Sequence, residues 1–236
     1  ATAYMDSIPL VVITGQVPTS TIGTDAFQEV DTFGMTLPIV KHSYLVKDVR
    51  MLDSVIDEAL RIAISGKPGP VVIDIPKDVT AALCSSNGVP RDEVISSNDV
   101  DLINTERIRT VVERLLSAKR PVLYVGGGIV TADAADELTH LVDILNVPVT
   151  PTLMGLGGFP SAHPACLGML GMHGTYTANT AISECDLLLA IGVRFDDRVT
   201  GKIATFAPNA EIIHIDIDPS NIGKNKQPHF SVVADA

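Results

Sequence analysis

Short apolar runs alternate with amphipathic helical patterns along most of the chain. Runs rich in Val, Ile and Leu predict strands at residues 9–14, 70–75, 121–125, 147–150, 186–191, 211–215 and 230–233. Strands that alternate with helices form βαβ units, in which the crossover helix brings successive strands into parallel pairing. The pattern therefore predicts an α/β fold with parallel sheets flanked by helices.

The clearest helix is predicted over residues 52–65. Its apolar stripe recurs at i, i+3, i+4, i+7 and i+8 and comprises Leu52, Val55, Ile56, Ala59, Leu60 and Ala63. Gly66 stands where a left-handed residue ends a helix, and Pro68 prevents continuation. A second helix is predicted from Asn104 or Thr105, with the stripe Ile108, Val111, Val112, Leu115 and Leu116. A third is predicted over about 132–145, with Thr131 as its cap.

Composition and charge exclude several classes of protein. Of 236 residues, 46% are hydrophobic and 19% are charged, which suits strands buried on both faces. The net charge of -11, with 4% aromatic residues and no Trp, argues against nucleic acid as a partner. No apolar run approaches the ~20 residues that span a bilayer. Cys84, Cys166 and Cys185 form no CxxC pair, so we expect no zinc site and reduced thiols in a cytosol-like compartment.

The segment "TAALCSSNGVPRDEVISSNDVDLIN", residues 80–104, lacks periodicity and is rich in Ser, Asn and Asp. That composition predicts a surface linker and a domain boundary. The stretches "SGKPGPVVIDIP" and "SAKRPVLYVGGG" resemble each other, which indicates either two similar domains or a common helix-to-strand connection. The chain begins inside a helical pattern, without Met, and ends directly after a strand, so we interpret it as an internal fragment of a longer protein.

Glycine-rich segments follow several of the predicted strands. The run Gly126–Gly128 lies between a strand and a helix, where helix N–H groups can bind a phosphate. The dinucleotide fingerprint requires Gly at position 131, where Thr131 stands, so a tight turn is the alternative. The segments 152–160 and 168–179 are either backbone lying against a ligand or ordinary loops. His173, in the second segment, is either structural or functional.

Four charged residues follow the strand predicted at 186–191. Arg194, Asp196, Asp197 and Arg198 form either a salt-bridged loop or the site of a charged ligand, since Arg presents a planar fork to phosphate or carboxylate. Asp216 ends the next strand, where open α/β sheets bind ligands, and its carboxylate suits ribose hydroxyls. The alternative for Asp216, and still more for Asp218, is a capping role.

The motifs "ITGQVPTSTIGTDAFQE", "SGKPGPVVIDIPKDV", "LGMLGMHGT", "GVRFDDRVTGK" and "HIDIDPSNIGKNK" together resemble the catalytic subunit of acetohydroxyacid synthases, also called acetolactate synthases. The resemblance implies an enzyme that uses thiamine diphosphate, FAD and Mg²⁺. It would condense hydroxyethyl-thiamine diphosphate, derived from pyruvate, with pyruvate or 2-ketobutyrate in branched-chain amino-acid synthesis. Residues 1–83 would be the C-terminal part of the pyrimidine-binding domain, 84–103 a linker, and 104–236 a truncated central FAD-binding domain.

The resemblance also implies residue roles. Phe27, Gln28 and Arg198 would act in catalysis, with Arg198 at the carboxylate of the second ketoacid. Lys41, Lys77, Met172, Asp197 and Arg198 would line a substrate and herbicide channel. FAD would lie against Ser7, Lys67, Gly126, Gly127, Gly128, Thr152, Leu153, Met154, Leu170, Gly171, Met172, His173, Gly192, Val193, Arg194, Phe195, Asp196, Asp216, Ile217, Asp235 and Ala236. The family pattern has Arg at position 67, and Lys67 keeps the charge but loses the bidentate fork.

Two parts of the family pattern are missing from the chain. The catalytic Glu would lie upstream of residue 1, and the metal-binding GDG motif downstream of residue 236, so we expect no metal ligands here and no activity from the fragment alone. The implied partners are other catalytic subunits, as a homodimer or homotetramer, and a regulatory small subunit. The implied location is the bacterial cytoplasm or an organelle. Glyoxylate carboligase, pyruvate oxidase and a non-enzymatic nucleotide-binding module are the alternatives.

Overall fold

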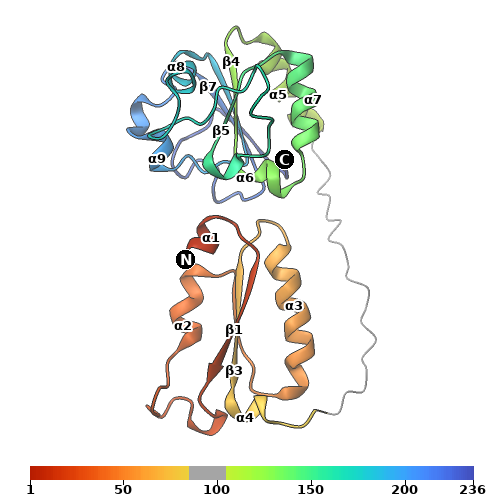
Figure 1. The fold of residues 1–236 in the computed structure, drawn as a ribbon, viewed down its shortest axis with the longest axis vertical. Helices are drawn as coiled ribbons and strands as arrows, with labels where there is room; N and C mark the ends of the chain where they lie inside the picture. Colours follow the sequence, from red (N-terminus) through yellow and green to blue (C-terminus); the bar gives the residue numbers. More distant parts are fainter. Residues whose placement is uncertain (85–104) are drawn as a thin grey trace. The chain divides into compact units, whose positions relative to one another are not determined.

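The computed structural model describes residues 1–84 and 105–236 and divides the chain into two compact units, Ala1–Asp99 and Val100–Ala236 (Figure 1). Except for Cys84, the predicted linker at 84–103 lies outside the described residues. Both units confirm the predicted α/β architecture, because every strand pair in both sheets is parallel.

The first unit is a three-stranded sheet between helices. Its elements are α1 (Thr2–Met5), β1 (Leu10–Gln16), η1 (Thr19–Thr21), α2 (Thr32–Thr36), η2 (Leu37–Ile39), β2 (His42–Leu45), η3 (Val49–Met51), α3 (Leu52–Ile64), β3 (Pro70–Pro76) and α4 (Lys77–Thr80). The strand order is β1-β3-β2. Because α3 and α2 cover opposite faces of the sheet, every residue of the central β3 is buried (Figure 1). Strand β2 was not predicted, since its four residues include His42 and Ser43 and give no apolar run.

Helix α3 follows the predicted stripe with one exception. Val55, Ala59 and Ala63 are buried against β3, whereas Leu60 is 52% exposed and was wrongly placed in the core. The apolar face of α3 is wider than the surface of the three-stranded sheet that covers it, so the residue at the edge of that face remains in solvent. Gly66 follows the helix with φ +51, which confirms the predicted left-handed end.

The second unit is a five-stranded sheet with the order β5-β4-β6-β7-β8. Its elements are α5 (Thr105–Ser117), β4 (Pro121–Val125), α6 (Gly127–Thr131), α7 (Ala135–Leu145), β5 (Val149–Pro151), η4 (Leu153–Gly155), α8 (Tyr176–Glu184), β6 (Leu187–Ile191), α9 (Asp197–Thr200), η5 (Ile203–Thr205), β7 (Glu211–Asp216) and β8 (Phe230–Val233). The predicted strands correspond to these to within a few residues.

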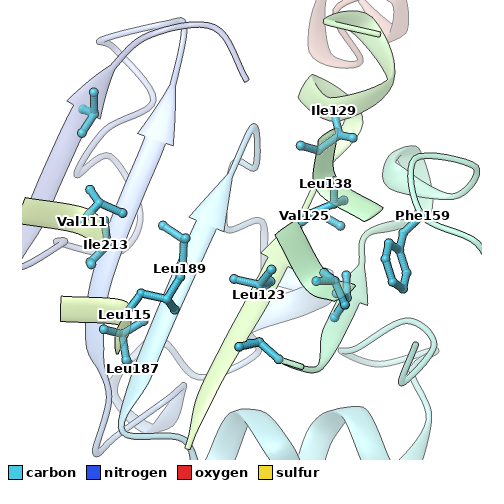
Figure 2. Packing of buried hydrophobic residues seen from close by; sticks show 14 residues of the cluster. Val111, Leu115, Leu123, Val125, Ile129, Leu138, Phe159, Leu187, Leu189 and Ile213 are labelled. Carbon is cyan, nitrogen blue, oxygen red and sulfur yellow. The ribbon is translucent and has the colours of Figure 1, made fainter. Parts of the chain in front are cut away.

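Alternate side chains of the central strands pack into two separate hydrophobic cores, one on each face of the sheet. Leu123 and Leu189 point to the face covered by α5 and α7, where Val111 and Leu138 complete the cluster (Figure 2). Their neighbours along each strand point to the opposite face and pack against α8. Strands buried on both faces in this way produce the continuous apolar runs of the sequence.

Two details of the helices differ from the prediction. Thr131 ends α6 instead of capping a long helix, and α7 begins only at Ala135. Asp133 lies between them with φ +56, a left-handed conformation that interrupts the helix. In α5, Val111 and Leu115 are buried, but Val112 and Leu116 are 44% and 66% exposed. A single helix face meets the sheet, so only part of the predicted stripe is covered.

Among residues 1–84 and 105–236, no helix combines the length and the apolar character needed to cross a membrane. Within the same ranges, no group of three or more His, Cys, Asp or Glu side chains gathers where it could hold a metal ion. The three cysteines are free thiols, and Cys185 is buried, which raises its pKa to about 11 and makes the thiolate scarce at neutral pH.

Candidate functional site

The loops that follow β4, β5, β6 and β7 meet at the carboxyl edge of the five-stranded sheet. Backbone hydrogen bonds link each loop to the neighbouring strand: Gly126 N donates to Ile191 O at 2.9 Å, and Gly192 N donates to Ile215 O at 2.8 Å. Thr152 N donates to Val125 O at 2.8 Å. The structure thus brings together the glycine run, the 152–154 segment, the charged motif and Asp216. In open α/β sheets this edge is the usual ligand-binding position.

The glycines of these loops are required by contacts between the loops themselves. A Cβ on Gly128 would lie 2.6 Å from Gly192 Cα, and a Cβ on Gly126 would lie 2.1 Å from Gly192 O. A Cβ on Gly155 would lie 2.6 Å from Val125 O. Gly126, Gly128 and Gly155 therefore allow one loop backbone to approach another closely.

The loop 168–174 is fastened to both α8 and α9. Asn179, on α8, donates from Nδ2 to Gly171 O at 3.1 Å and accepts from Gly171 N at 2.9 Å. Met172 N donates to Arg198 O at 2.9 Å. A Cβ on Gly171 would lie 2.5 Å from Arg198 O, so the two segments touch. Sequence reasoning missed Asn179, which no periodicity distinguishes.

The charged motif turns twice before it enters α9. Gly192 and Phe195 have φ +61 and +51, and the non-glycine Phe195 is held there by edge-on ring contacts with Tyr124, Phe206 and His214. Burial of Tyr124 in this cluster raises the pKa of its hydroxyl. Packing that compensates for a left-handed backbone is typical of functional loops.

Asp196, Asp197 and Arg198 make different contacts at the start of α9. Asp196 Oδ1 caps α9 by accepting from Arg198 N at 3.0 Å and Val199 N at 3.2 Å. Arg198 Nε lies 3.9 Å from Asp197 Oδ2, and both side chains are largely exposed, at 71% and 83%. The backbone of Arg198 is thus fixed at N and O while its guanidinium projects into solvent. Such a long, exposed pair contributes little to stability and leaves the fork available to an anion.

Several predicted site residues contribute only backbone at this edge. Leu170, Val193 and Phe195 are 5%, 2% and 2% exposed, and their side chains lie inside the core. A ligand on the loops could meet their N–H and C=O groups but not their side chains.

Asp216 ends β7 with its carboxylate nearly buried, at 5% exposure. Its Oδ1 accepts from Asp218 N at 2.8 Å and Asn221 Nδ2 at 3.3 Å, so one oxygen serves the following turn. Asp218 in turn accepts from Ser220 N at 2.9 Å, which is the capping role considered for it. The second oxygen of Asp216 retains acceptor capacity. Ile217 follows, half-buried, and Asp235 and Ala236 lie exposed beyond β8.

His214 was not singled out in the sequence, although it lies in the same strand. It is fully buried, and its Nε2 lies 2.9 Å from Val193 O and 3.7 Å from Asp216 Oδ2. A carbonyl only accepts, so Nε2 carries the proton and donates to Val193. Within the described chain, Nδ1 has no hydrogen-bond partner. The polar residue at a core position of "IIHIDID" was the available signal.

The predicted residues of the first unit divide between two edges of its sheet. Phe27 and Gln28 lie in the loop after β1, and Lys77 begins α4 directly after β3, so these three are at the carboxyl edge. Ser7, Lys41 and Lys67 precede β1, β2 and β3 and are at the amino edge.

Lys41 has a structural task at that amino edge. Its Nζ donates to Ser65 O at 2.5 Å and to Ile62 O, two carbonyls at the end of α3. Burial lowers the pKa of its ammonium. Cations at helix C-termini are stabilising, and the two carbonyls hold this side chain against α3.

The carboxyl edge of the second unit combines exposed apolar and charged side chains. Leu153, Met154 and Met172 are 69%, 41% and 62% exposed, and His173 is exposed beside them. Arg194, half-buried, and Arg198 supply positive charge, while Asp216 supplies an acceptor. Apolar side chains with a few oriented polar groups are typical of cofactor sites. This set fits a ligand with a flat apolar ring and an anionic, hydroxylated part, such as a flavin nucleotide.

A separate hollow of about 510 Å³ lies at the opposite, amino edge of this sheet. Leu115, Lys119, Arg120, Leu145 and Cys185 are among the residues that line it. It contains none of the predicted site residues. The candidate site is therefore the carboxyl edge, where loops of four strands converge.

Comparisons with known proteins match this arrangement to one family. Residues 108–236 match the family model for the central domain of thiamine pyrophosphate enzymes. The whole chain is 50% identical to the acetolactate synthase large subunit of Cyanidium caldarium and 52% identical to that of Parasynechococcus marenigrum, covering 41% and 38% of those proteins. It is 51% identical to the large subunit of acetolactate synthase isozyme 1 of Escherichia coli, again over 100% of this chain and 41% of that protein.

The chain thus spans about two fifths of the length of these relatives. The family model covers more than half of the chain, and the similarity to the large subunits continues through both units. The chain therefore belongs to the family of thiamine pyrophosphate enzymes, whose central domain it contains.

Proposed function

We propose that this chain is part of the catalytic subunit of an acetolactate synthase, which joins a two-carbon unit from pyruvate to a second 2-ketoacid. The observation that carries the proposal is the identity of about half of all residues with synthase large subunits, sustained over both units. The converging loops at the carboxyl edge support it, because they present charge and apolar surface together.

We propose that residues 1–83 form part of a pyrimidine-binding domain and that 104–236 form most of a central domain that binds FAD. Thiamine diphosphate, when bound, supplies the carbon nucleophile of the reaction, and we expect its Mg²⁺ ligands outside this chain. In the first unit, Phe27 and Gln28 would face this cofactor. In the second, the loops after β4 and β6 would hold FAD, with Leu153 and Met154 against its ring and Asp216 at its hydroxyls.

Arg198 is the residue that we propose for the carboxylate of the second ketoacid. Its backbone is fixed by Asp196 and Met172 while its guanidinium stays exposed, so the fork can reach a carboxylate in the solvent. A bidentate guanidinium–carboxylate contact would orient the ketone for attack. Asp197, Met172 and Lys77 would border the approach, and we assign Lys41 a structural role at the end of α3.

We also propose that the whole protein assembles from several catalytic subunits and associates with a smaller regulatory subunit. The support is the description of the relatives as large subunits. Sedimentation of the gene-encoded protein, alone and with a co-expressed partner, measures both associations.

Product analysis of the gene-encoded protein tests the function. With thiamine diphosphate, Mg²⁺, FAD and pyruvate we expect acetolactate, and with added 2-ketobutyrate the corresponding acetohydroxy acid. Extraction of bound flavin from the purified protein gives an independent readout. Bound NAD or AMP without flavin, and no condensation product, would show instead a nucleotide-binding module without synthase activity.

A further inference from the structure

None of the residues of the loop 17–31, between β1 and α2, is buried. At its tip, Phe27 is 88% exposed, and Gln28 has φ +64. Asp25 has φ +59, so the tip contains two non-glycine residues in the left-handed region. Each of these costs on the order of 1 kcal/mol, and apolar packing does not compensate for it here. Other contacts must hold the loop in this shape.

A single side chain fastens both ends of the loop. Gln16, the last residue of β1, accepts from Val17 N at 2.9 Å through Oε1 and donates from Nε2 to Val30 O at 2.8 Å. The second hydrogen of Nε2 goes to Asp74 Oδ2 at 2.9 Å. Both amide hydrogens and the amide oxygen are thus engaged, and these bonds join the first residues of the loop to its end.

Asp74 determines the orientation of this amide. It lies in the middle of β3, 2% exposed, and also accepts from Thr14 Oγ1 at 2.7 Å. A carboxylate only accepts, so the NH₂ group of Gln16 must face Asp74 and its oxygen must face Val17. A buried carboxylate is costly unless it is hydrogen-bonded, which makes the arrangement of Thr14, Gln16 and Asp74 mutually dependent.

Two further carboxylates hold the body of the loop. Asp78, in α4, accepts from Thr19 N at 2.9 Å and from Thr19 Oγ1 at 2.5 Å. Glu29 accepts from Ala26 N at 3.0 Å and from Gly23 N, across the turn that precedes Phe27. The hydrogen bonds from Thr19 lower the pKa of Asp78, and the amides of Gly23 and Ala26 lower that of Glu29.

We propose that Asp74, acting through Gln16, and Asp78, acting through Thr19, are positioning residues that hold Phe27 and Gln28 at the carboxyl edge of the first unit. The assignment of Phe27 and Gln28 to the reaction rests on the proposed function, whereas the order of the loop does not. The loop is a preformed platform, and its shape comes from polar contacts with β3 and α4. Loosening either contact lowers turnover by letting the tip leave its catalytic position.

The experiment compares Gln16→Met with the wild type in the gene-encoded protein. Methionine has a similar length but cannot donate to Val30 or Asp74. We expect hydrogen exchange of a peptide covering 17–31 to accelerate about tenfold, while peptides covering α3 and β3 keep their protection. Condensation of pyruvate should fall about tenfold with flavin content unchanged. Thr24→Val is the matched control, since it removes only a bond to Thr21 O within the loop. It should leave both readouts near wild type.

A second pair of variants keeps the test decisive if Gln16→Met does not fold. Asp78→Ala removes both acceptors of Thr19 on the surface, whereas Asp78→Asn keeps one and should restore part of the turnover. Unchanged exchange of 17–31 in both Gln16→Met and Asp78→Ala would overturn the proposal, as would faster exchange with undiminished turnover. If the wild type makes no acetohydroxy acid, the synthase proposal fails. Hydrogen exchange of the 17–31 peptide then tests by itself whether Asp74 and Asp78 hold the loop.

Discussion

The two units hold the loops of their candidate sites by different physical means. At the carboxyl edge of the second unit, Gly126, Gly128 and Gly192 let loop backbones touch, with no space for a Cβ between them. At the same edge of the first unit, the loop 17–31 is held by Asp74, Asp78 and Glu29 through hydrogen bonds. The contacts among these three glycines depend on the absence of side chains, whereas the loop 17–31 depends on charged side chains.

The difference indicates how each region responds to change. Backbone contacts between glycines contain no titratable group, so acid leaves them intact, but any Cβ disrupts them. The carboxylate clamp, which consists of Asp74, Asp78 and Glu29, accommodates most substitutions in the loop 17–31. It weakens when its carboxylates are protonated. We therefore expect substitutions to disturb the glycine contacts of the second unit more than the loop 17–31, and acid to disturb the loop 17–31 more than the glycine contacts.

The largest effect is expected from Gly192→Ala. Its Cβ would lie 2.6 Å from Gly128 Cα, and φ of +61 adds backbone strain. Overpacking costs about 1–3 kcal/mol and the left-handed backbone about 1–2 kcal/mol, so we expect the free energy of unfolding to fall by about 3 kcal/mol. Denaturant unfolding followed by circular dichroism measures it.

Gly66→Ala is the matched control for that substitution. Gly66 has φ +51, but nothing lies within 4 Å of the position that a Cβ would take, so only the backbone cost of about 1–2 kcal/mol applies. Equal losses for Gly192→Ala and Gly66→Ala would show that contact between the loops does not matter, and the comparison between the regions would fail.

Arg198→Ala should weaken binding of the second ketoacid in the second unit without disturbing the contacts between its glycines. Losing a charge-assisted carboxylate contact costs about 1.5–3 kcal/mol, which is a fall of roughly 10- to 150-fold in kcat/KM for the second ketoacid. The glycine contacts remain, so flavin content and stability should not change. Arg109→Ala, on the exposed side of α5, is the control. Flavin loss with unaltered ketoacid preference would place Arg198 at the cofactor instead.

The smallest expected effect is the response to acid. The pKa values of Asp78 and Glu29 are lowered from 3.8 and 4.5 by their hydrogen bonds, so their contribution is complete above those values and is lost as pH falls through the folded-state pKa. Pepsin cleavage within 17–31 should stay slow at pH 5 and increase below about pH 4. The loop 168–174 is held by the amide of Asn179, which does not titrate, so its cleavage should increase only when the whole unit unfolds.

The variant Asp78→Asn with Glu29→Gln controls for the acid response. Both amides keep an acceptor oxygen but do not titrate in this range, so cleavage of 17–31 should depend less on pH than in the wild type after correction for the protease. Simultaneous cleavage of both loops in the wild type would show that no separate acid-sensitive clamp exists.

Most strands were predictable because a strand that is buried on both faces consists of a continuous run of apolar residues. Strand β2 was missed because an edge strand of four residues carries no such run. The start of α7 was misplaced because nothing in "TADAA" shows that Asp133 takes a left-handed conformation. Leu60 and Leu116 continue their stripes, and only the way each helix packs against its sheet decides that they remain exposed.

The sequence by itself determined the alternation of strands and helices, the parallel pairing and the motifs by which the family is recognised, because periodicity and local spacing are properties of the chain. Only the tertiary structure decided what the polar residues and glycines do. Gly128 meets Gly192, Lys41 meets the end of α3, and Asp74 meets Gln16 across 58 positions. Such pairs lie far apart along the chain, and their chemistry depends on distances of a few ångströms that only folding establishes.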